Sequence, residues 1–233
     1  QRSGDGDAER HRPLERPAVR TTRALALAAL AVALAGCGSA KSSSGSATLW
    51  VTRDRGAVVL HAEQVPAGES VMQALDRVAS VKTRFGGRYV RSVDGLAEQG
   101  HRSWFYYVNG YLADRSAADY RLRPDDVAWW DYRAWHDPAQ DPIVLGSFPQ
   151  PFTSGYDGKR RPAVVISTDP RARRVARRLQ ARLITTRGQM AGANVLVLGT
   201  GPTRIQMTGT SPGSPVRMTF SGDPRVLLRP RPF

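Results

Sequence analysis

The stretch that decides the fold spans residues 103–132 and reads SWFYYVNGYLADRSAADYRLRPDDVAWWDY. Residues 104–108 have strand character, and Asn109-Gly110 follows them directly. Asn-Gly between two extended runs predicts a tight hairpin, because a type I′ turn needs positive φ at both central positions. A second aromatic strand is predicted over residues 127–132, after a Pro-Asp-Asp turn. Aromatic side chains bury the most area per residue, so we expect this stretch to form much of a domain core.

The chain upstream of this stretch predicts a hairpin followed by a helix. Residues 47–51 and 58–65 are predicted strands, and residues 69–82 are predicted to form a helix with one apolar face. Residues 89–93 are a further extended piece. The order of hairpin, helix and strands predicts an α+β fold of the β-grasp type, in which one sheet wraps around one helix.

Several motifs in this region resemble a known family. The motifs are, in chain order, residues 70–75, 93–96, 104–110, 117–120, Leu122, Asp126 and residues 127–132. Together they resemble the signature of the transcobalamin-like C-terminal domain, a small β-grasp module of many bacterial surface lipoproteins. The resemblance covers residues 47–135, and Asp125 departs from it because the family usually has Gly there.

The resemblance also implies a ligand. In the animal cobalamin carriers that this module resembles, the related domain closes over bound cobalamin. The resemblance therefore implies capture of a corrinoid outside the cell and transfer to an importer, such as an energy-coupling-factor transporter.

The N-terminal residues predict a lipoprotein signal peptide. Two basic residues, Arg20 and Arg23, precede an uncharged Ala/Leu-rich run over residues 24–35, and Leu-Ala-Gly-Cys37 matches a lipobox. The run is typical of a signal-peptide h-region and is shorter than the roughly 20 apolar residues of a transmembrane helix. We expect residues 1–36 to be an N-terminal extension and the signal peptide.

Cys37, the one cysteine of the sequence, is then the expected lipidation site. Residues 37–46 are rich in Ser and Gly and predict a flexible tether. The expected localisation is the outer face of the cell membrane, where the lipid anchor holds the protein.

The positive charge is concentrated in the C-terminal part. Residues 37–156 carry 13 Lys and Arg against 13 Asp and Glu, whereas residues 157–233 carry 15 against 3. This difference predicts two domains with different surfaces. We expect a transcobalamin-like β-grasp domain at residues 47–136, a Pro/Gly-rich connector at 137–158 and a basic α/β or α+β domain at 159–233.

The basic domain is predicted to begin with a strand, a helix and a strand, at residues 163–167, 171–187 and 194–198. Weaker strands are predicted over residues 204–207, 216–220 and 226–228. The helix would present a basic face of Arg171, Arg173, Arg174, Arg177, Arg178 and Arg182.

Enzymatic chemistry has little support in the sequence. The single cysteine and four histidines without an H-x-x-x-H pair argue against a metal site. A G-x-S-x-G nucleophile motif is absent, and the Gly-Thr-Gly-Pro loop at residues 199–202 lacks the helix that a dinucleotide site requires. We therefore expect a protein that is not an enzyme and has no cofactor.

Binding of a small ligand is the alternative to enzymatic activity that makes the more specific prediction. Successive side chains of a strand alternate between its two faces, so Trp129 and Trp130 are predicted to face opposite ways. One would join the core, and the other would be exposed or lie under the connector. The residues leave two interpretations open, a binding surface for a flat ligand or a scaffold whose aromatic residues are all core. The candidate ligand contacts are Trp104, Tyr106, Tyr111, Trp129, Trp130, Tyr132 and Trp135.

The basic face suggests a different partner. Nucleic acid is disfavoured by the expected export and by the lack of interleaved aromatic residues. Anionic lipid headgroups, acidic wall polymers or an acidic loop of a membrane protein agree better with the expected location. The remaining interpretation is a solvated helix with no partner.

Overall fold

The computed structural model describes residues 45–135, 141–186, 188 and 190–229. The predictions on the signal peptide, on Cys37 and on all but the end of the tether lie outside the described residues. Among the described helices, none combines the length and the hydrophobicity that a membrane span requires.

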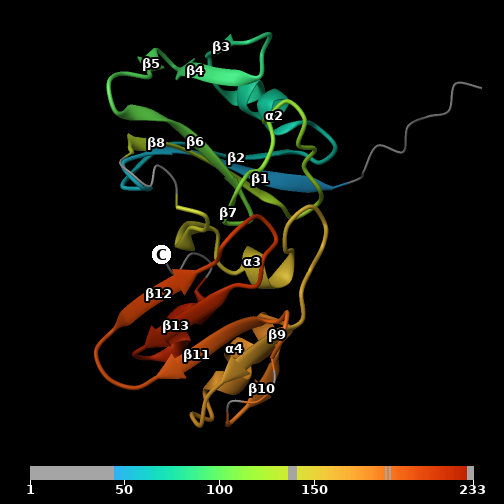
Figure 1. Ribbon diagram of the computed structural model, residues 1–233, viewed down its shortest axis with the longest axis vertical. Coiled ribbons are helices and arrows are strands. Elements are labelled where there is room, and N and C mark those ends of the chain that lie inside the picture. Colours follow the sequence, from blue (N-terminus) through green and yellow to red (C-terminus); the bar gives the residue numbers. More distant parts are fainter. Residues whose placement is uncertain (1–44, 136–140, 187, 189, 230–233) are drawn as a thin grey trace, which may run out of the picture. The chain divides into compact units, whose positions relative to one another are not determined.

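The first sheet has five strands in the order β2-β1-β8-β6-β7 (Figure 1). Strands β1 and β8 are parallel, and the other neighbouring strands are antiparallel. The predicted strands of this region are therefore confirmed. Their bounds are β1 Ser46–Arg53, β2 Val58–Pro66, β6 Arg102–Val108, β7 Tyr111–Leu112 and β8 Val127–Ala134.

The predicted hairpin turn is confirmed between β6 and β7. Asn109 has φ 52° and Gly110 has φ 88°, the left-handed values that a type I′ turn requires. The Asn109 side chain is fully buried and links three segments. Its Oδ1 accepts from the Val127 amide at 2.8 Å, and its Nδ2 donates to Asp126 Oδ1 at 2.6 Å and to the Gly155 carbonyl at 2.9 Å. The turn thereby fixes the start of β8.

Helix α2 spans Val71–Val78, so the prediction of a helix over residues 69–82 is too long. Ser70 begins the helix with a capping box that includes Gln73. The helix ends at Val78 with Ala79 as its C-cap, because the Ser80 amide donates to Asp94 Oδ1 at 2.8 Å and the following residues pair as strands. Those strands form a three-stranded sheet of β3 Val81–Arg84, β4 Tyr89–Val93 and β5 Leu96–Ala97.

Alternate residues of the central strands form the core on one face of the first sheet. Leu49 of β1 and Trp130 of β8 belong to one buried cluster with Val71 and Leu75 of α2. The next residues in each strand, Trp50 and Trp129, lie outside this cluster. The two faces of the sheet therefore have different roles.

The Pro/Gly-rich connector includes two short helical segments. It contains the 3-10 helix η1 (Leu145–Ser147) and the short helix α3 (Gln150–Thr153). Phe148 and Phe152 are buried, and their rings lie 6.0 Å apart. Both rings belong to the buried core cluster, so the connector packs against the rest of the described chain.

The second sheet has five strands in the order β10-β9-β11-β13-β12, all parallel except the β12–β13 pair. The strand predictions at residues 163–167, 194–198, 204–207 and 216–220 are confirmed to within two residues. The bounds are β9 Ala163–Ile166, β10 Arg182–Ile184, β11 Asn194–Gly199, β12 Arg204–Thr208 and β13 Arg217–Ser221.

Two predictions in this region are wrong. Helix α4 spans only Ala172–Arg178, and residues 182–184 form β10 instead, because they pair with β9 in parallel. Residues 226–228 are not a strand but part of the 3-10 helix η2 (Pro224–Leu228), where the Asp223 side chain accepts from the Arg225 amide. The chain as a whole is α+β, with mixed sheets and few helices.

Candidate ligand-binding site

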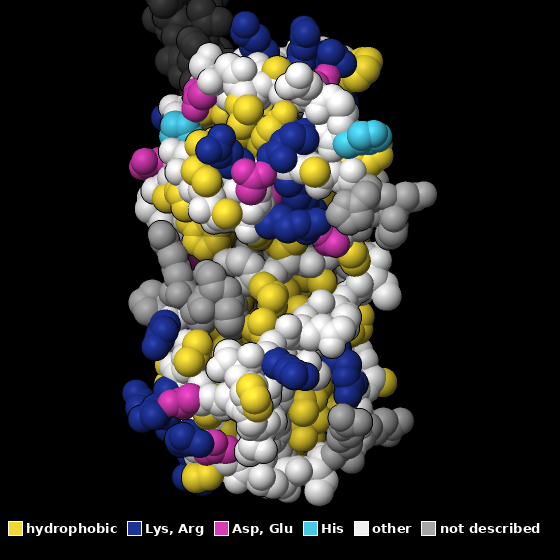
Figure 2. Space-filling model, turned by 90° about the vertical axis from the view of Figure 1, so that its left-hand side faces the viewer, with side chains coloured by type: hydrophobic (Ala, Val, Ile, Leu, Met, Phe, Trp, Pro, Cys, Tyr) yellow, Lys and Arg dark blue, Asp and Glu magenta, His cyan; other side chains and the backbone are white. Residues whose placement is uncertain are grey.

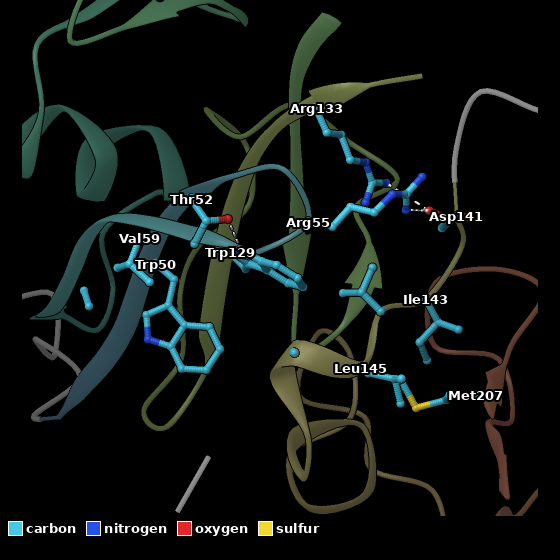
Figure 3. Close-up of a pocket in the computed structure, with 14 residues that line it drawn as sticks. Trp50, Thr52, Arg55, Val59, Trp129, Arg133, Asp141, Ile143, Leu145 and Met207 are labelled. Atoms are coloured by element: carbon cyan, nitrogen blue, oxygen red, sulfur yellow. Dashed lines mark hydrogen bonds and ion pairs between the residues drawn. The ribbon is translucent and has the colours of Figure 1, made fainter. Parts of the chain in front are cut away.

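A cavity of about 490 Å³ lies on the face of the first sheet opposite α2 (Figure 3). Strands β1 and β8 provide its aromatic residues, and the β1–β2 turn provides Arg55. The connector contributes residues 141 and 143–146, and β12 contributes Met207. Pockets for small ligands typically measure about 300–1,000 Å³, so the cavity is large enough for one.

Trp50 and Trp129 are the two tryptophans of this cavity. They are register partners in the parallel β1–β8 pair, and their side chains therefore stand on the same face of the sheet. Trp129 is 6% exposed, whereas Trp50 is half-buried. The sheet thus supplies an aromatic wall built from residues far apart in the sequence.

The orientation of Trp129 is fixed by a chain of hydrogen bonds. Its Nε1 donates to Thr52 Oγ1 at 2.7 Å (Figure 3). Thr52 Oγ1 in turn donates to Asp131 Oδ1 at 2.6 Å. Asp131 is fully buried and also accepts from the backbone amides of Arg55 at 3.0 Å and Gly56 at 3.3 Å. The same carboxylate therefore orders the indole and the β1–β2 turn.

Two glycines leave room for the Trp129 ring. A Cβ atom on Gly146 would lie 2.7 Å from Cζ3 of Trp129, and one on Gly56 would lie 3.3 Å from Cζ2. Real Cβ contacts are rarely so short, so the ring lies directly against backbone at both places. The expectation that one of the two adjacent tryptophans lies under the connector is therefore confirmed for Trp129.

Two arginines and one aspartate form the charged end of the cavity. Arg55 Nη1 lies 2.6 Å from Asp141 Oδ2, and Arg133 Nη2 lies 3.4 Å from the same oxygen (Figure 3). The hydrogen bond with Asp141 raises the pKa of Arg55 above its ordinary value. Figure 2 shows basic and acidic side chains in close groups beside exposed hydrophobic side chains on one face of the molecule.

Side chains of strand β6 fix the position of the Arg133 guanidinium. Arg133 is 3% exposed, donates to the Tyr107 hydroxyl and lies over the rings of Phe105 and Tyr107 at 5.1 and 5.3 Å. Burial raises the pKa of Tyr107 to about 12, so the phenol stays neutral at physiological pH. The guanidinium therefore has a fixed place at the end of the cavity.

The side of the cavity opposite the sheet is apolar. Ile143 and Leu145 come from the connector, and Met207 comes from β12. The arrangement can therefore bind a small molecule that has a flat apolar body and a group that accepts hydrogen bonds from guanidinium.

Of the seven candidate ligand contacts, Trp129 lines the cavity. Four others pair on the α2 face of the first sheet. Trp104 lies 5.3 Å from Tyr132, and Tyr106 lies 4.9 Å from Trp130, as measured between ring centroids. Their rings join the core cluster or pack against it.

The remaining two candidates, Tyr111 and Trp135, are also away from the cavity. Tyr111 is buried, donates from its hydroxyl to the Ser214 carbonyl at 3.1 Å and packs edge-on against Tyr156. The Trp135 ring lies 5.2 Å from the ring of His101.

The six arginines of the predicted basic face do not all lie on one exposed face of the helix. Arg171 pairs with Asp169 at 2.7 Å, and Arg178 donates to the carbonyls of Leu227 at 2.9 Å and Arg229 at 2.5 Å. Arg182 belongs to β10 and not to the helix. On the helix, Arg173, Arg174 and Arg177 remain exposed.

The described residues contain no group of three or more His, Cys, Asp or Glu side chains that could hold a metal ion. Among the histidines, His61 lies 2.6 Å from Asp94. Sequence reasoning missed Trp50, Arg55, Arg133 and Asp141 as cavity residues. A usable signal was present in β8, because Trp129, Asp131 and Arg133 are two residues apart and must share one face.

Residues 68–134 match a family model described as a domain of unknown function, DUF4430. Among solved structures, haptocorrin in complex with Cbi is similar, at 14% sequence identity and a TM-score of 0.34, over 40% of this chain and 25% of that chain. The chain thus spans about a quarter of that structure. A Ruminococcus gnavus protein described as a "putative metal binding protein" is similar at 10% identity and a TM-score of 0.33, over 40% of this chain and 99% of that chain. No curated protein matches the chain.

Proposed function

We propose that this chain is a small-ligand-binding protein and not an enzyme, and that it works outside the cell from a lipid anchor on Cys37. The observation that carries the binding proposal is the cavity of about 490 Å³ with its fixed Trp129 ring. Its mixture of apolar walls with a few placed polar groups is the usual composition of a ligand pocket. The support for export is the N-terminal sequence, with its basic flank, apolar run and lipobox.

The ligand that we propose to test first is a corrinoid, and the partner is an importer of the energy-coupling-factor type or another importer. The support is the resemblance of residues 47–135 to the transcobalamin-like C-terminal domain. We also propose that the first sheet and α2 form a β-grasp module. In favour of this are the β1–β2 hairpin, the parallel pairing of β1 with β8, and the packing of α2 on one face.

Binding is tested on the full chain with Cys37→Ser, which cannot be acylated. Cobalamin and cobinamide are titrated by calorimetry, and the visible spectrum of the corrinoid is followed in parallel. We expect saturable binding that Trp129→Phe weakens and that Trp135→Phe, a tryptophan away from the cavity, leaves unchanged. If neither corrinoid binds, the corrinoid proposal fails.

A second candidate function is the binding of an acidic envelope partner through α4. Arg173, Arg174 and Arg177 are exposed there, and no ion pair is recorded for them within the described residues. Vesicles with anionic lipids and soluble acidic wall polymers are suitable probes. Charge reversal at Arg174 and Arg177 would weaken such binding, and added salt would weaken it further. Binding that is insensitive to both would rule this function out.

A further inference from the structure

We infer that the ligand of the cavity carries a carboxylate beside a flat apolar body, and that this carboxylate takes the place now held by Asp141. The inference rests on the proposed function, since it concerns the same cavity. It names a carboxylic acid as a ligand class different from the corrinoids, because cobalamin and cobinamide carry amides and no free carboxylate, and it names the residues that select the acid.

Two guanidinium groups converge on a single carboxylate oxygen at the end of the cavity. Asp141 Oδ2 is 2.6 Å from Arg55 Nη1 and 3.4 Å from Arg133 Nη2 (Figure 3). Guanidinium donors match the planar geometry of a carboxylate, which makes arginine the usual residue for binding one. The two guanidinium groups therefore form a binding position for a carboxylate, and the Asp141 carboxylate marks where the carboxylate of the ligand would lie.

One of the two arginines, Arg133, is held by groups other than Asp141. Arg133 extends from a central strand and is held by the Tyr107 hydroxyl and by the rings of Phe105 and Tyr107. Its side chain is only 4% exposed. A buried cation is costly unless an anion lies nearby, so a ligand that brings one is favoured at this place.

Asp141 is an exposed member of this group of three charges. Its side chain is 50% exposed, and the residue belongs to the connector, outside any strand or helix. If Asp141 moved into solvent, the guanidinium groups of Arg55 and Arg133 would face the cavity, and the carboxylate of the ligand would compensate their charge.

The apolar body of the ligand is defined by the rest of the lining. The Trp129 indole stands on the sheet side, and Ile143 and Met207 stand on the other side. An aromatic or other planar ring that enters here would contact the indole while its acid group reaches the arginines. A ligand with a carboxylate and no apolar part would use only the charged end.

The test compares 2-naphthoate with 2-naphthamide, which differ in charge but hardly in shape. Binding to the full chain with Cys37→Ser is measured by calorimetry and by the NMR shift of the Trp129 indole N–H. We expect 2-naphthoate to bind about tenfold more tightly, as charge-assisted hydrogen bonds are the stronger ones. Arg55→Gln should remove this preference, whereas Arg53→Gln, an exposed arginine of the same strand–turn segment that does not line the cavity, should preserve it.

Asp141→Asn provides the second variant. It removes the competing charge, so it should tighten binding of 2-naphthoate severalfold and leave 2-naphthamide unchanged. Equal affinity for acid and amide, or no effect of Arg55→Gln, would overturn the inference. If a corrinoid shifts the Trp129 signal while 2-naphthoate shows no preference over the amide, the inference fails and the proposed function stands. If neither the naphthalene probes nor the corrinoids shift that signal, both fail.

Discussion

The indole nitrogen of Trp129 lies 2.7 Å from the hydroxyl oxygen of Thr52, although the two residues are 77 positions apart in the sequence. Thr52 in turn donates to the buried Asp131 at 2.6 Å. A single hydroxyl therefore connects the aromatic wall of the cavity to the carboxylate that orders the β1–β2 turn. We therefore expect loss of the Thr52 hydroxyl to lower both the free energy of unfolding and the affinity for the ligand.

Replacing the Thr52 hydroxyl tests this connection. Thr52→Val keeps the shape of the side chain but leaves the buried indole N–H of Trp129 without its acceptor and removes one of the donors to Asp131 Oδ1. We expect a loss of about 1–3 kcal/mol in the free energy of unfolding, measured by urea denaturation. Thr48→Val in the same strand is the control, because the Thr48 hydroxyl bonds only the exposed Gln64 side chain at 2.9 Å. An equal loss in both variants would contradict the role given to Thr52.

The contact of Trp129 with the connector can be tested at Gly146. Alanine there would place its Cβ 2.7 Å from the ring, so the indole must move. We expect a loss of about 1–3 kcal/mol in the free energy of unfolding, the usual cost of overpacking, and a changed NMR shift of the Trp129 indole. Gly188→Ala is the matched control, since no atom lies within 4 Å of its added Cβ. An unchanged Trp129 signal in Gly146→Ala would show that the ring and the connector are not in contact.

The carboxyl groups of Asp126 and Asp94 should titrate in opposite directions from the ordinary value of 3.8. Burial raises the pKa of Asp126, and the hydrogen bond with His61, helped by the Ser80 amide, lowers the pKa of Asp94. Carbon-detected NMR titration of the two side-chain carboxyls measures both. The order would be contradicted if Asp94 lost its proton at the higher pH.

These shifts have opposite consequences for stability. Above pH 3.8, folded Asp126 keeps its proton longer than the unfolded chain does, so its contribution to the free energy of unfolding falls as pH rises through its folded pKa. Asp94 contributes stability above pH 3.8, which is lost as pH falls through its lowered pKa. Urea denaturation of Asp94→Asn at several pH values should show a destabilisation that shrinks in acid.

The arginines of α4 should separate into two classes. Arg178 donates to the carbonyls of Leu227 and Arg229 and so joins the helix to the C-terminal described segment. We expect Arg178→Ala to lower the free energy of unfolding by about 1–3 kcal/mol, because those carbonyls lose a charged donor. Arg174→Ala, at an exposed position of the same helix, should change it by less than about 0.5 kcal/mol. If both variants unfold alike, the division of the basic face is wrong.

The lipid anchor is tested at Cys37. Expression with a labelled fatty acid should label the full chain, and Cys37→Ser should abolish the label and release the protein from the membrane fraction. Ser44→Ala in the tether is the control and should keep the label. A labelled Cys37→Ser variant would contradict lipidation at this residue.

Local patterns in the sequence predicted the strands and the hairpin turn well. The Asn109-Gly110 turn needs positive φ at two adjacent residues, which those residue types provide wherever the chain continues. Helix ends were predicted less well, because pairing between distant segments decided them. Residues 182–184 continue a helical pattern in the sequence, but in the structure they pair with β9 as a strand. Similarly, Val81 and Lys82 lie within the predicted helix over residues 69–82, but they belong to strand β3.

The cavity could be predicted only in part. The alternation of Trp129 and Trp130 correctly placed one indole on each face of β8. The partner strand β1, which brings Trp50 and Thr52 beside Trp129, is joined by a parallel pairing that no local pattern reveals. Arg55 and Asp141 come from a turn and a connector, where side-chain positions depend on the packed sheet beneath them.

Titration of the full Cys37→Ser chain, labelled with nitrogen-15 in its tryptophan indoles, tests the central claim most directly. Cobalamin, cobinamide, 2-naphthoate and 2-naphthamide are added in turn, and all indole signals are followed. The account predicts that at least one of these compounds shifts the Trp129 signal saturably and leaves that of Trp135, away from the cavity, unchanged. No shift of Trp129 with any of the four, or equal shifts of both signals, would contradict it.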